Sequence, residues 1–173
     1  DKLAEDLIVL RNHGEKEKYV HYQVGINSRL DSIQAAVLNA KLPHLNAWNN
    51  RRREIADFYD QAFAEAGLAP EYIKTPIRHN EADGSLHTFH QYSILCHDRD
   101  DLSAFLKNKG IGNSVFYPVV LYLQPCFGYL GDKKGLCPVA EKVADSVLSI
   151  PVYPELTQEQ QIQVIETIKE YYL

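Results

Sequence analysis

Apolar and polar residues recur along the first part of this chain with the spacing of amphipathic helices. Apolar residues repeat three or four positions apart over residues 1–10, from Ser28 to Pro43 and from Leu45 to Gly67, which predicts three helical stretches. Pro43 should end or kink the second stretch, and Gly67 suits a left-handed cap after the third. We therefore expect a long helix or helix pair with a proline break.

The predicted helices differ in their caps and in one charged position. Residues 1–10 lack the cap chemistry of a natural helix start, whereas Ser28 and Asp31 have the spacing of a capping box that opens a helix. Arg52 falls on an apolar stripe, where its stem could cover the core or its guanidinium could bind a ligand. The stripes consist of Leu30, Ile33, Val37 and Leu38, then Leu45, Trp48, Ile55, Tyr59 and Phe63.

Strands and helices alternate in residues 68–173, which is typical of a small two-layer α/β unit. The expected strands cover residues 72–75, 90–96 and 111–117, and the expected helices cover 101–109 and begin again at Pro138 and Thr157. Pro70, Pro76 and Asp83-Gly84 mark turns. The inner faces of the last two helices should be Val139, Val143, Val147 and Leu148, then Ile162, Ile165 and Ile168.

The composition is that of an ordinary globular protein. Of 173 residues, 45% are hydrophobic and 24% are charged, which indicates neither disorder nor a membrane protein. The net charge of -5 argues against a nucleic-acid-binding surface. No apolar run approaches the ~18 residues of a membrane span. With no secretion signal at the start, we predict a cytoplasmic protein.

The reactive side chains show no catalytic or metal-binding signature. Cys96, Cys126 and Cys137 lack ligand spacing, which predicts reduced thiols and no metal site. His87 and His90 would point to opposite faces of a strand, so they cannot bind one metal ion together. We therefore assign no catalytic residue and no metal ligand within this chain.

Two segments have the residue types of a binding site. From Gly25 to Arg29 a glycine gives backbone access, Asn27 offers an amide donor and Arg29 offers a guanidinium, which together suit a phosphate or carboxylate. These side chains could instead brace a helix start. Tyr117 and the proline-bounded residues 118–125 could line a pocket or pack against a sheet edge.

A series of short motifs follows in a fixed order along almost the whole chain. They are Leu10-Arg-Asn-His-Gly14, Gly25-Ile-Asn-Ser-Arg-Leu-Asp31, Gln34-Ala-Ala36, Arg52-Arg53, Tyr59, His90-Gln-Tyr92, Arg99-Asp-Asp-Leu102, Gly110-Ile111, Tyr117-Pro118, Leu121-Tyr-Leu-Gln-Pro125, Pro138-Val-Ala-Glu141 and Leu148-Ser-Ile-Pro-Val-Tyr-Pro154. Together they resemble the second half of the DegT/DnrJ/EryC1/StrS sugar aminotransferases.

The resemblance implies an α/β fold, the small C-terminal domain of a type I aminotransferase, with an antiparallel sheet packed with helices after a long proline-kinked helix. Residues 1–67 would be the end of the large domain and the interdomain helices, and residues 68–173 the small domain. Family members use pyridoxal 5'-phosphate (PLP) to move an amino group, usually from glutamate, onto a keto group of a nucleotide-linked hexose. The resemblance also implies homodimers and a role in polysaccharide biosynthesis.

Site residues follow from the same resemblance. Asn27 would reach across the dimer to the cofactor phosphate, and Arg29 would lie close by, facing the substrate. Tyr117, His90 and Gln91 would contribute to the substrate pocket.

The resemblance also implies what this chain lacks. In the family, the catalytic lysine and the carboxylate that protonates the pyridine nitrogen precede the segment matching Arg11-Asn-His-Gly14. None of the lysines here stands in that context, and the chain begins at Asp1 and contains no methionine. We therefore expect a fragment that is inactive alone.

Two positions depart from the family pattern. Phe116 and Tyr122 stand where family members often carry histidine, which should alter substrate choice. The combination of residues 90–92 with Tyr117-Pro118 points to members that act on 3-keto sugars. The alternative is a noncatalytic dimerisation or interaction module in which the long helix forms a dimer surface.

Overall fold

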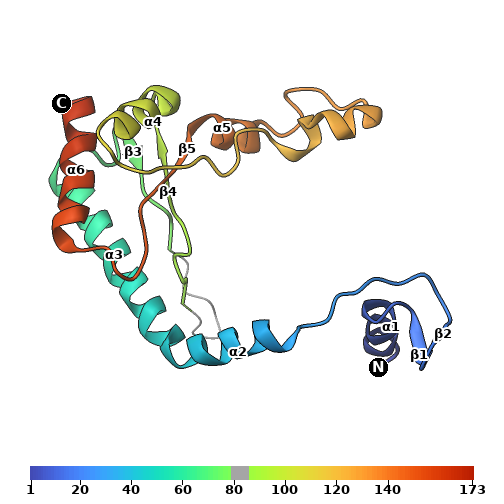
Figure 1. Ribbon diagram of the computed structural model, residues 1–173. Helices are drawn as coiled ribbons and strands as arrows, with labels where there is room; N and C mark the ends of the chain where they lie inside the picture. Colours follow the sequence, from blue (N-terminus) through green and yellow to red (C-terminus); the bar gives the residue numbers. More distant parts are fainter. Residues whose placement is uncertain (79–85) are drawn as a thin grey trace. The chain divides into compact units, whose positions relative to one another are not determined.

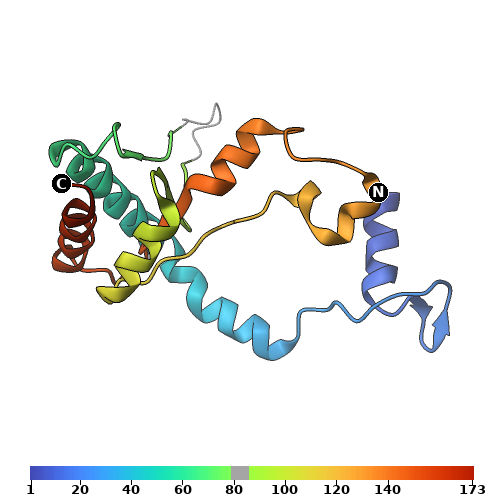
Figure 2. The same cartoon turned by 90° about the horizontal axis from the view of Figure 1, so that it is seen from above.

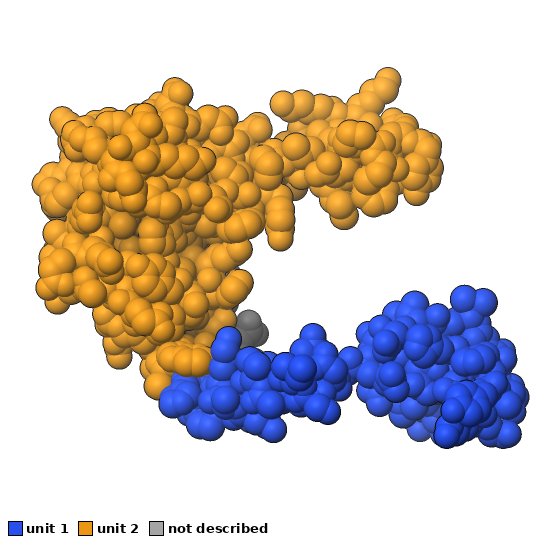
Figure 3. All heavy atoms as spheres, in the orientation of Figure 1, with its two compact units in different colours: residues 1–45 blue, residues 46–173 orange. Residues whose placement is uncertain are grey.

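The computed structural model describes residues 1–78 and 86–173 (Figure 1). The chain divides into two compact units, residues 1–45 and 46–173, which Figure 3 colours separately. The turn predicted at Asp83-Gly84 lies outside the described residues. The assignment of residues 1–67 to the end of a large domain, and of residues 68–173 to a small domain, stays a prediction.

Unit 1 begins with helix α1 (Lys2–Arg11) and a short antiparallel pair, β1 (Glu15–Glu17) and β2 (Val20–His21). The Asp1 carboxylate accepts a hydrogen bond from the backbone N–H of Leu3 at 3.1 Å and so caps α1. The prediction that this helix lacks cap chemistry was therefore wrong.

The second helix starts later than the sequence suggested. Helix α2 spans Ser32–Lys41, and its N-cap is Asp31, which accepts from the backbone N–H of Gln34 at 2.9 Å. The N–H of Ser28 instead donates to the carbonyl of Arg11 at 2.9 Å, which holds this stretch extended. The predicted Ser28–Asp31 capping box was therefore wrong.

A proline break follows α2, as predicted. Pro43 lies in one 3-10 turn, η1 (Leu42–His44), which leads directly into helix α3 (Leu45–Glu65). Gly67 has φ 71°, the left-handed conformation expected after the helix end. The apolar stripe from Leu30 to Leu38 is exposed.

Unit 2 contains a three-stranded antiparallel sheet in the order β3-β4-β5. The strands are β3 (Ile73–Lys74), β4 (Tyr92–Cys96) and β5 (Val147–Ile150), and the helices after β4 are α4 (Arg99–Asn108), α5 (Pro138–Ser146) and α6 (Gln158–Tyr172). In Figures 1 and 2, α3 and α6 lie on one side of the sheet and α5 lies on the other. This α/β arrangement with an antiparallel sheet is the fold that the sequence predicted.

Residues 111–117 do not form the expected strand. Ser114 makes one isolated bridge with Ser149, through hydrogen bonds of 3.1 and 2.8 Å. The side chain of Asn113 donates to the carbonyls of Ser103 and Ile111, and Pro118 has no N–H to extend a ladder. The chain then forms two short 3-10 helices, η2 (Leu121–Leu123) and η3 (Pro125–Leu130).

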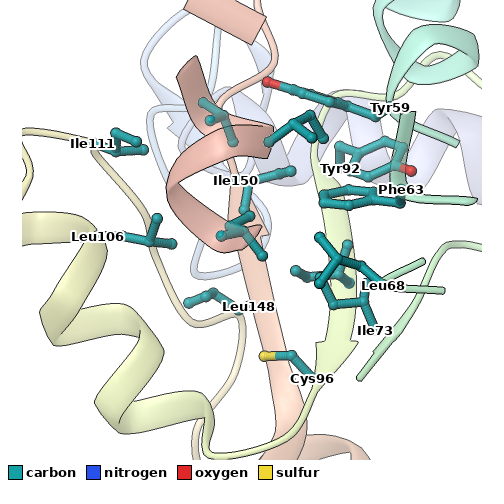
Figure 4. Packing of buried hydrophobic residues seen from close by; sticks show 14 of the residues in the cluster. Tyr59, Phe63, Leu68, Ile73, Tyr92, Cys96, Leu106, Ile111, Leu148 and Ile150 are labelled. Atoms are coloured by element: carbon teal, nitrogen blue, oxygen red, sulfur yellow. The ribbon is translucent and has the colours of Figure 1, made fainter. Parts of the chain in front are cut away.

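The core of unit 2 joins residues that lie far apart in the sequence. Figure 4 shows Leu148 and Ile150 of β5 between Tyr59 and Phe63 of α3 on one side and Leu106 and Ile111 on the other. Tyr59, Phe63, Leu106 and Leu148 have no exposed surface. Burial of such side chains stabilises the unit by about 1.5–3 kcal/mol each.

The last two helices confirm one prediction and correct others. Thr157 and Gln160 form the expected capping box, in which each side chain bonds the other's backbone N–H. Val139 and Val143 were predicted to face inward on α5 but are exposed, because the face with Glu141 and Ala144 is the buried one. In α6, Ile165 and Ile168 are buried as predicted, whereas Ile162 is exposed.

Candidate functional site

A short ladder holds the glycine-rich segment of unit 1. The N–H of Ile26 donates to the carbonyl of Leu10 at 2.9 Å, and the N–H of His13 donates to the carbonyl of Ile26 at 3.0 Å. Ser28 extends the ladder by its bond to Arg11. Asn27 therefore lies between Ile26 and Ser28, whose backbone groups are both hydrogen-bonded to the segment 10–13.

Two glycines let these segments approach each other. A Cβ on Gly25 would meet the backbone N of Gly14 at 2.2 Å and the carbonyl oxygen of Leu10 at 2.6 Å. A Cβ on Gly14 would meet the carbonyl oxygen of Gln23 at 1.7 Å, and Gly14 also has φ 75°. All three contacts are with backbone atoms, so no side chain can move aside to accommodate a larger residue at these positions.

Asn27 and Arg29 form an exposed polar pair on this ladder. The Nε of Arg29 donates to Oδ1 of Asn27 at 3.4 Å, so the carbonyl end of the amide faces the guanidinium. Within residues 1–78 and 86–173, the Nδ2 amide of Asn27 and the terminal nitrogens of Arg29 make no other hydrogen bond and are available as donors. Directed amide donors beside a guanidinium charge are suited to an anionic group such as a phosphate.

Two of the predicted residues of unit 2, His90 and Gln91, lie at a groove of about 550 Å³, here called the His90 groove. Its lining includes His90, Gln91, Phe116, Val152 and Tyr153. His90 precedes β4 rather than lying within a strand, which corrects the prediction that it shares a strand with His87.

Tyr117 does not line the His90 groove. Its side chain is 74% exposed, and its ring meets that of Phe116 edge-on at 5.7 Å between centroids. The structure therefore brings together Asn27 with Arg29 in unit 1, and His90 with Gln91 in unit 2.

A polar cluster fixes the loop after Tyr117. The hydroxyl of Tyr122 donates to Oε1 of Glu141, and the backbone N–H of Gly135 donates to the same oxygen at 2.7 Å. The bond from Tyr122 lowers the pKa of Glu141 most, followed by the bond from Gly135. The pKa of Tyr122 is raised, by desolvation first and by its bond to Glu141 second. Tyr122 thus bonds within unit 2 through its hydroxyl.

Residues 1–169 match the DegT/DnrJ/EryC1/StrS aminotransferase family. The chain belongs to this family. It is 49% identical over 99% of its length to the pleiotropic regulatory protein of Geobacillus stearothermophilus, covering 45% of that protein. It is 38% identical over 98% of its length to the dTDP-3-amino-3,4,6-trideoxy-alpha-D-glucose transaminase of Streptomyces venezuelae, covering 43%.

A solved structure of the family confirms the fold. The X-ray structure of S. venezuelae DesV in complex with a ketimine intermediate matches with a TM-score of 0.86 and 36% identity, over 98% of this chain and 44% of that one. This chain therefore spans a little under half the length of these relatives. The fold corresponds to the C-terminal part of the family's members.

Two negative findings concern the described residues. Residues 1–78 and 86–173 contain no group of three or more His, Cys, Asp or Glu side chains that could hold a metal ion. Within the same ranges, no helix combines the length and apolar character that crossing a membrane requires.

Two residues that bind segments around the His90 groove, Arg52 and Tyr59, appeared in the sequence only on an apolar stripe and among the family motifs. Arg52 was assigned either a packing or a ligand role, but its Nη1 donates to the carbonyls of Phe89, His90 and Val152 at 3.2, 3.2 and 2.8 Å. The hydroxyl of Tyr59 donates to the carbonyl of Pro151 at 3.0 Å. Partners this far apart in the chain leave no local pattern, although the position of Arg52 on an apolar stripe was a partial signal.

Proposed function

We propose that this chain is part of a PLP-dependent aminotransferase that moves an amino group from glutamate to a keto group of a nucleotide-linked hexose. The observation that carries the proposal is the family match over residues 1–169, which includes the ladder that presents Asn27 and Arg29. The S. venezuelae relative, named as a transaminase of a 3-amino sugar, supports a 3-keto sugar as substrate.

PLP fits the donors that unit 1 offers. Its phosphate requires directed hydrogen bonds and positive charge, which Asn27 Nδ2 and the Arg29 guanidinium supply from an exposed, backbone-fixed position. When bound, PLP stores the electron pair released at the carbon that loses a proton. We assign Asn27 to hold the cofactor phosphate of the neighbouring subunit in a homodimer, with Arg29 beside it toward the substrate.

The unit 2 residues are assigned to the nucleotide-linked sugar. His90 and Gln91 line the His90 groove and offer an imidazole and an amide for hydroxyl groups, which supports a substrate role for both. Tyr117 is exposed on the neighbouring loop, where its ring can cover a sugar or a base bound at the surface. The Tyr122–Glu141 bond fixes that loop, so we expect Tyr122 to act by orienting Tyr117.

The reaction centre is assigned to a segment outside residues 1–173. None of the lysines here stands in the family's lysine context, and the chain covers 43–45% of the relatives' lengths. We therefore propose that the chain alone does not transfer amino groups. A cytoplasmic location and a role in polysaccharide biosynthesis belong to the same proposal.

The test uses the full-length protein that contains this chain, purified with PLP. Glutamate should convert the absorption of the bound cofactor to its amino form, and a nucleotide-linked 3-keto hexose should restore the starting spectrum with release of an amino sugar. A protein that binds no PLP, or that forms no amino sugar from any 3- or 4-keto nucleotide sugar, would contradict the proposal.

A noncatalytic interaction module is the second candidate. The Geobacillus relative is named a pleiotropic regulatory protein, and Ile33, Val37 and Leu38 on α2 are exposed apolar side chains. Such a stripe is typical of an interface that another surface covers. A full-length protein that dimerises through α2 but lacks amino-transfer activity would favour this candidate.

A further inference from the structure

The His90 groove opens where two strands of the sheet separate. The ladder between β4 and β5 ends with the pair Tyr92 and Ile150. The next residue after β5 is Pro151, which has no N–H to continue the ladder. Gln91 and His90 on one chain segment, and Val152 and Tyr153 on the other, then line the groove.

Arg52 connects the two separating segments. Its Nη1 donates to the His90 carbonyl at 3.2 Å on the β4 side and to the Val152 carbonyl at 2.8 Å on the β5 side. A third contact, to the Phe89 carbonyl at 3.2 Å, anchors the residue before His90. One guanidinium nitrogen thus takes the place of the backbone hydrogen bonds that the sheet loses at this point.

Two further side chains of α3 bind the same β5-side segment. The hydroxyl of Tyr59 donates to the Pro151 carbonyl at 3.0 Å, and Nη2 of Arg51 donates to the Leu156 carbonyl at 3.1 Å. Arg52 differs from both because it also holds the β4-side segment. Arg52 is therefore the side chain of these three that links the two segments at this edge of the groove.

We propose that Arg52 is a positioning residue that sets the opening of the His90 groove and thereby orients His90 and Gln91 toward the nucleotide-linked sugar. Arg52 acts through its carbonyl partners and is not assigned to touch the substrate. The proposal rests on the proposed function in one respect, the identity of the ligand in the groove.

Arg53 provides a matched control on the same helix. It is the next residue in the chain, it is also half-buried, and its guanidinium donates to Asn50 within α3. Arg53→Gln removes the same charge and the same number of atoms as Arg52→Gln without touching either segment of the groove.

The experiment measures the two half-reactions of the full-length PLP-loaded enzyme separately. In Arg52→Gln, kcat/KM for the nucleotide-linked keto sugar should fall about ten- to a hundredfold, because small misplacements of binding groups cost this much. The glutamate half-reaction should change by less than about twofold, because the His90 groove is assigned to the sugar and not to glutamate. A uniform loss of folded enzyme would instead lower both half-reactions together. Arg53→Gln should resemble wild type in both.

Arg52→Lys keeps the charge and offers an ammonium group as donor to the same carbonyls, so it should restore part of the lost sugar half-reaction. This variant also covers the case in which Arg52→Gln folds poorly. Equal losses in both half-reactions, an equal loss in Arg53→Gln, or no loss in Arg52→Gln would each overturn the proposal.

Amide hydrogen exchange of the same proteins separates this proposal from the proposed function. Peptides covering residues 88–92 and 151–155 should exchange faster in Arg52→Gln than in wild type, and at the wild-type rate in Arg53→Gln. A wild-type enzyme without amino-transfer activity would contradict the proposed function, and the exchange data would then decide the positioning role. Unchanged amide exchange of these peptides in Arg52→Gln would overturn the positioning role of Arg52.

Discussion

Gly25→Ala should open the ladder that presents Asn27. The new Cβ would lie 2.2 Å from the backbone N of Gly14 and 2.6 Å from the carbonyl oxygen of Leu10, both far inside contact distance. Overpacking of this kind costs about 1–3 kcal/mol. Each broken ladder bond adds about 0.5–1.5 kcal/mol. With one bond lost, we expect unit 1 to be destabilised locally by about 1.5–4.5 kcal/mol.

Amide hydrogen exchange of the full chain measures this effect directly. Because every 1.4 kcal/mol is a tenfold change in an equilibrium, the amides of Ile26 and Ser28 should exchange about 10- to 1,600-fold faster. Gly128→Ala is the matched control, because its Cβ meets no atom within 4 Å and its backbone is not left-handed. In the full-length protein, Gly25→Ala should also weaken PLP retention, whereas Gly128→Ala should not.

One result would refute this reasoning. If the amides of Ile26 and Ser28 kept wild-type protection in Gly25→Ala, the two backbone segments would not be in the close contact that the Gly25 and Gly14 distances describe. Wild-type protection together with weakened PLP binding would separate the ladder from the role assigned to Asn27.

The other predictions concern the cofactor contact, a helix cap and a titrating side chain. Asn27→Ala in the full-length enzyme should weaken PLP retention about ten- to a hundredfold, because a hydrogen bond to a charged group contributes about 1.5–3 kcal/mol. The melting temperature should stay nearly unchanged. A lowered melting temperature with unaltered PLP affinity would contradict this prediction. Thr157→Ala should destabilise unit 2 by about 1 kcal/mol in denaturant titrations, because Thr157 caps α6 and bonds the N–H of Gln160; a loss confined to unit 1 would count against it. Glu141 has a lowered pKa in the folded state, so its contribution to stability is present above its unfolded pKa and is lost as the pH falls through the folded pKa. Glu141→Gln should therefore flatten this part of the plot of unfolding free energy against pH. An unchanged plot would rule out the Tyr122–Glu141 bond as the source of this pH dependence.

Local sequence patterns predicted those parts of the fold that depend on neighbouring residues. The Pro43 break, the left-handed Gly67 and the Thr157 capping box are set by residues within a few positions, and the structure contains all three. The helix start at Ser28 failed because its backbone N–H is taken by Arg11, a partner 17 positions away that no local pattern reveals.

The same distinction applies to the candidate site. Asn27 and Arg29 stood out because glycine, amide and guanidinium occur together in five residues, and they do lie side by side. The buried face of α5 was predicted wrongly because a charged residue such as Glu141 normally indicates the solvent-exposed face of a helix. Its carboxylate is buried against Tyr122 and Gly135, which approach from a loop that precedes the helix.

The last helix has a consequence for how the protein is made. Helix α6 contributes Val164, Ile165 and Ile168 to a core that also contains residues of α3 and β4, more than 60 residues earlier, and the hydroxyl of Tyr172 donates to the carbonyl of His97 at 2.6 Å. During synthesis the ribosome releases α3 and β4 long before α6, so their apolar faces stay uncovered until α6 emerges. Unit 2 therefore completes its folding after translation of α6, and nascent chains paused before residue 158 should depend on chaperones.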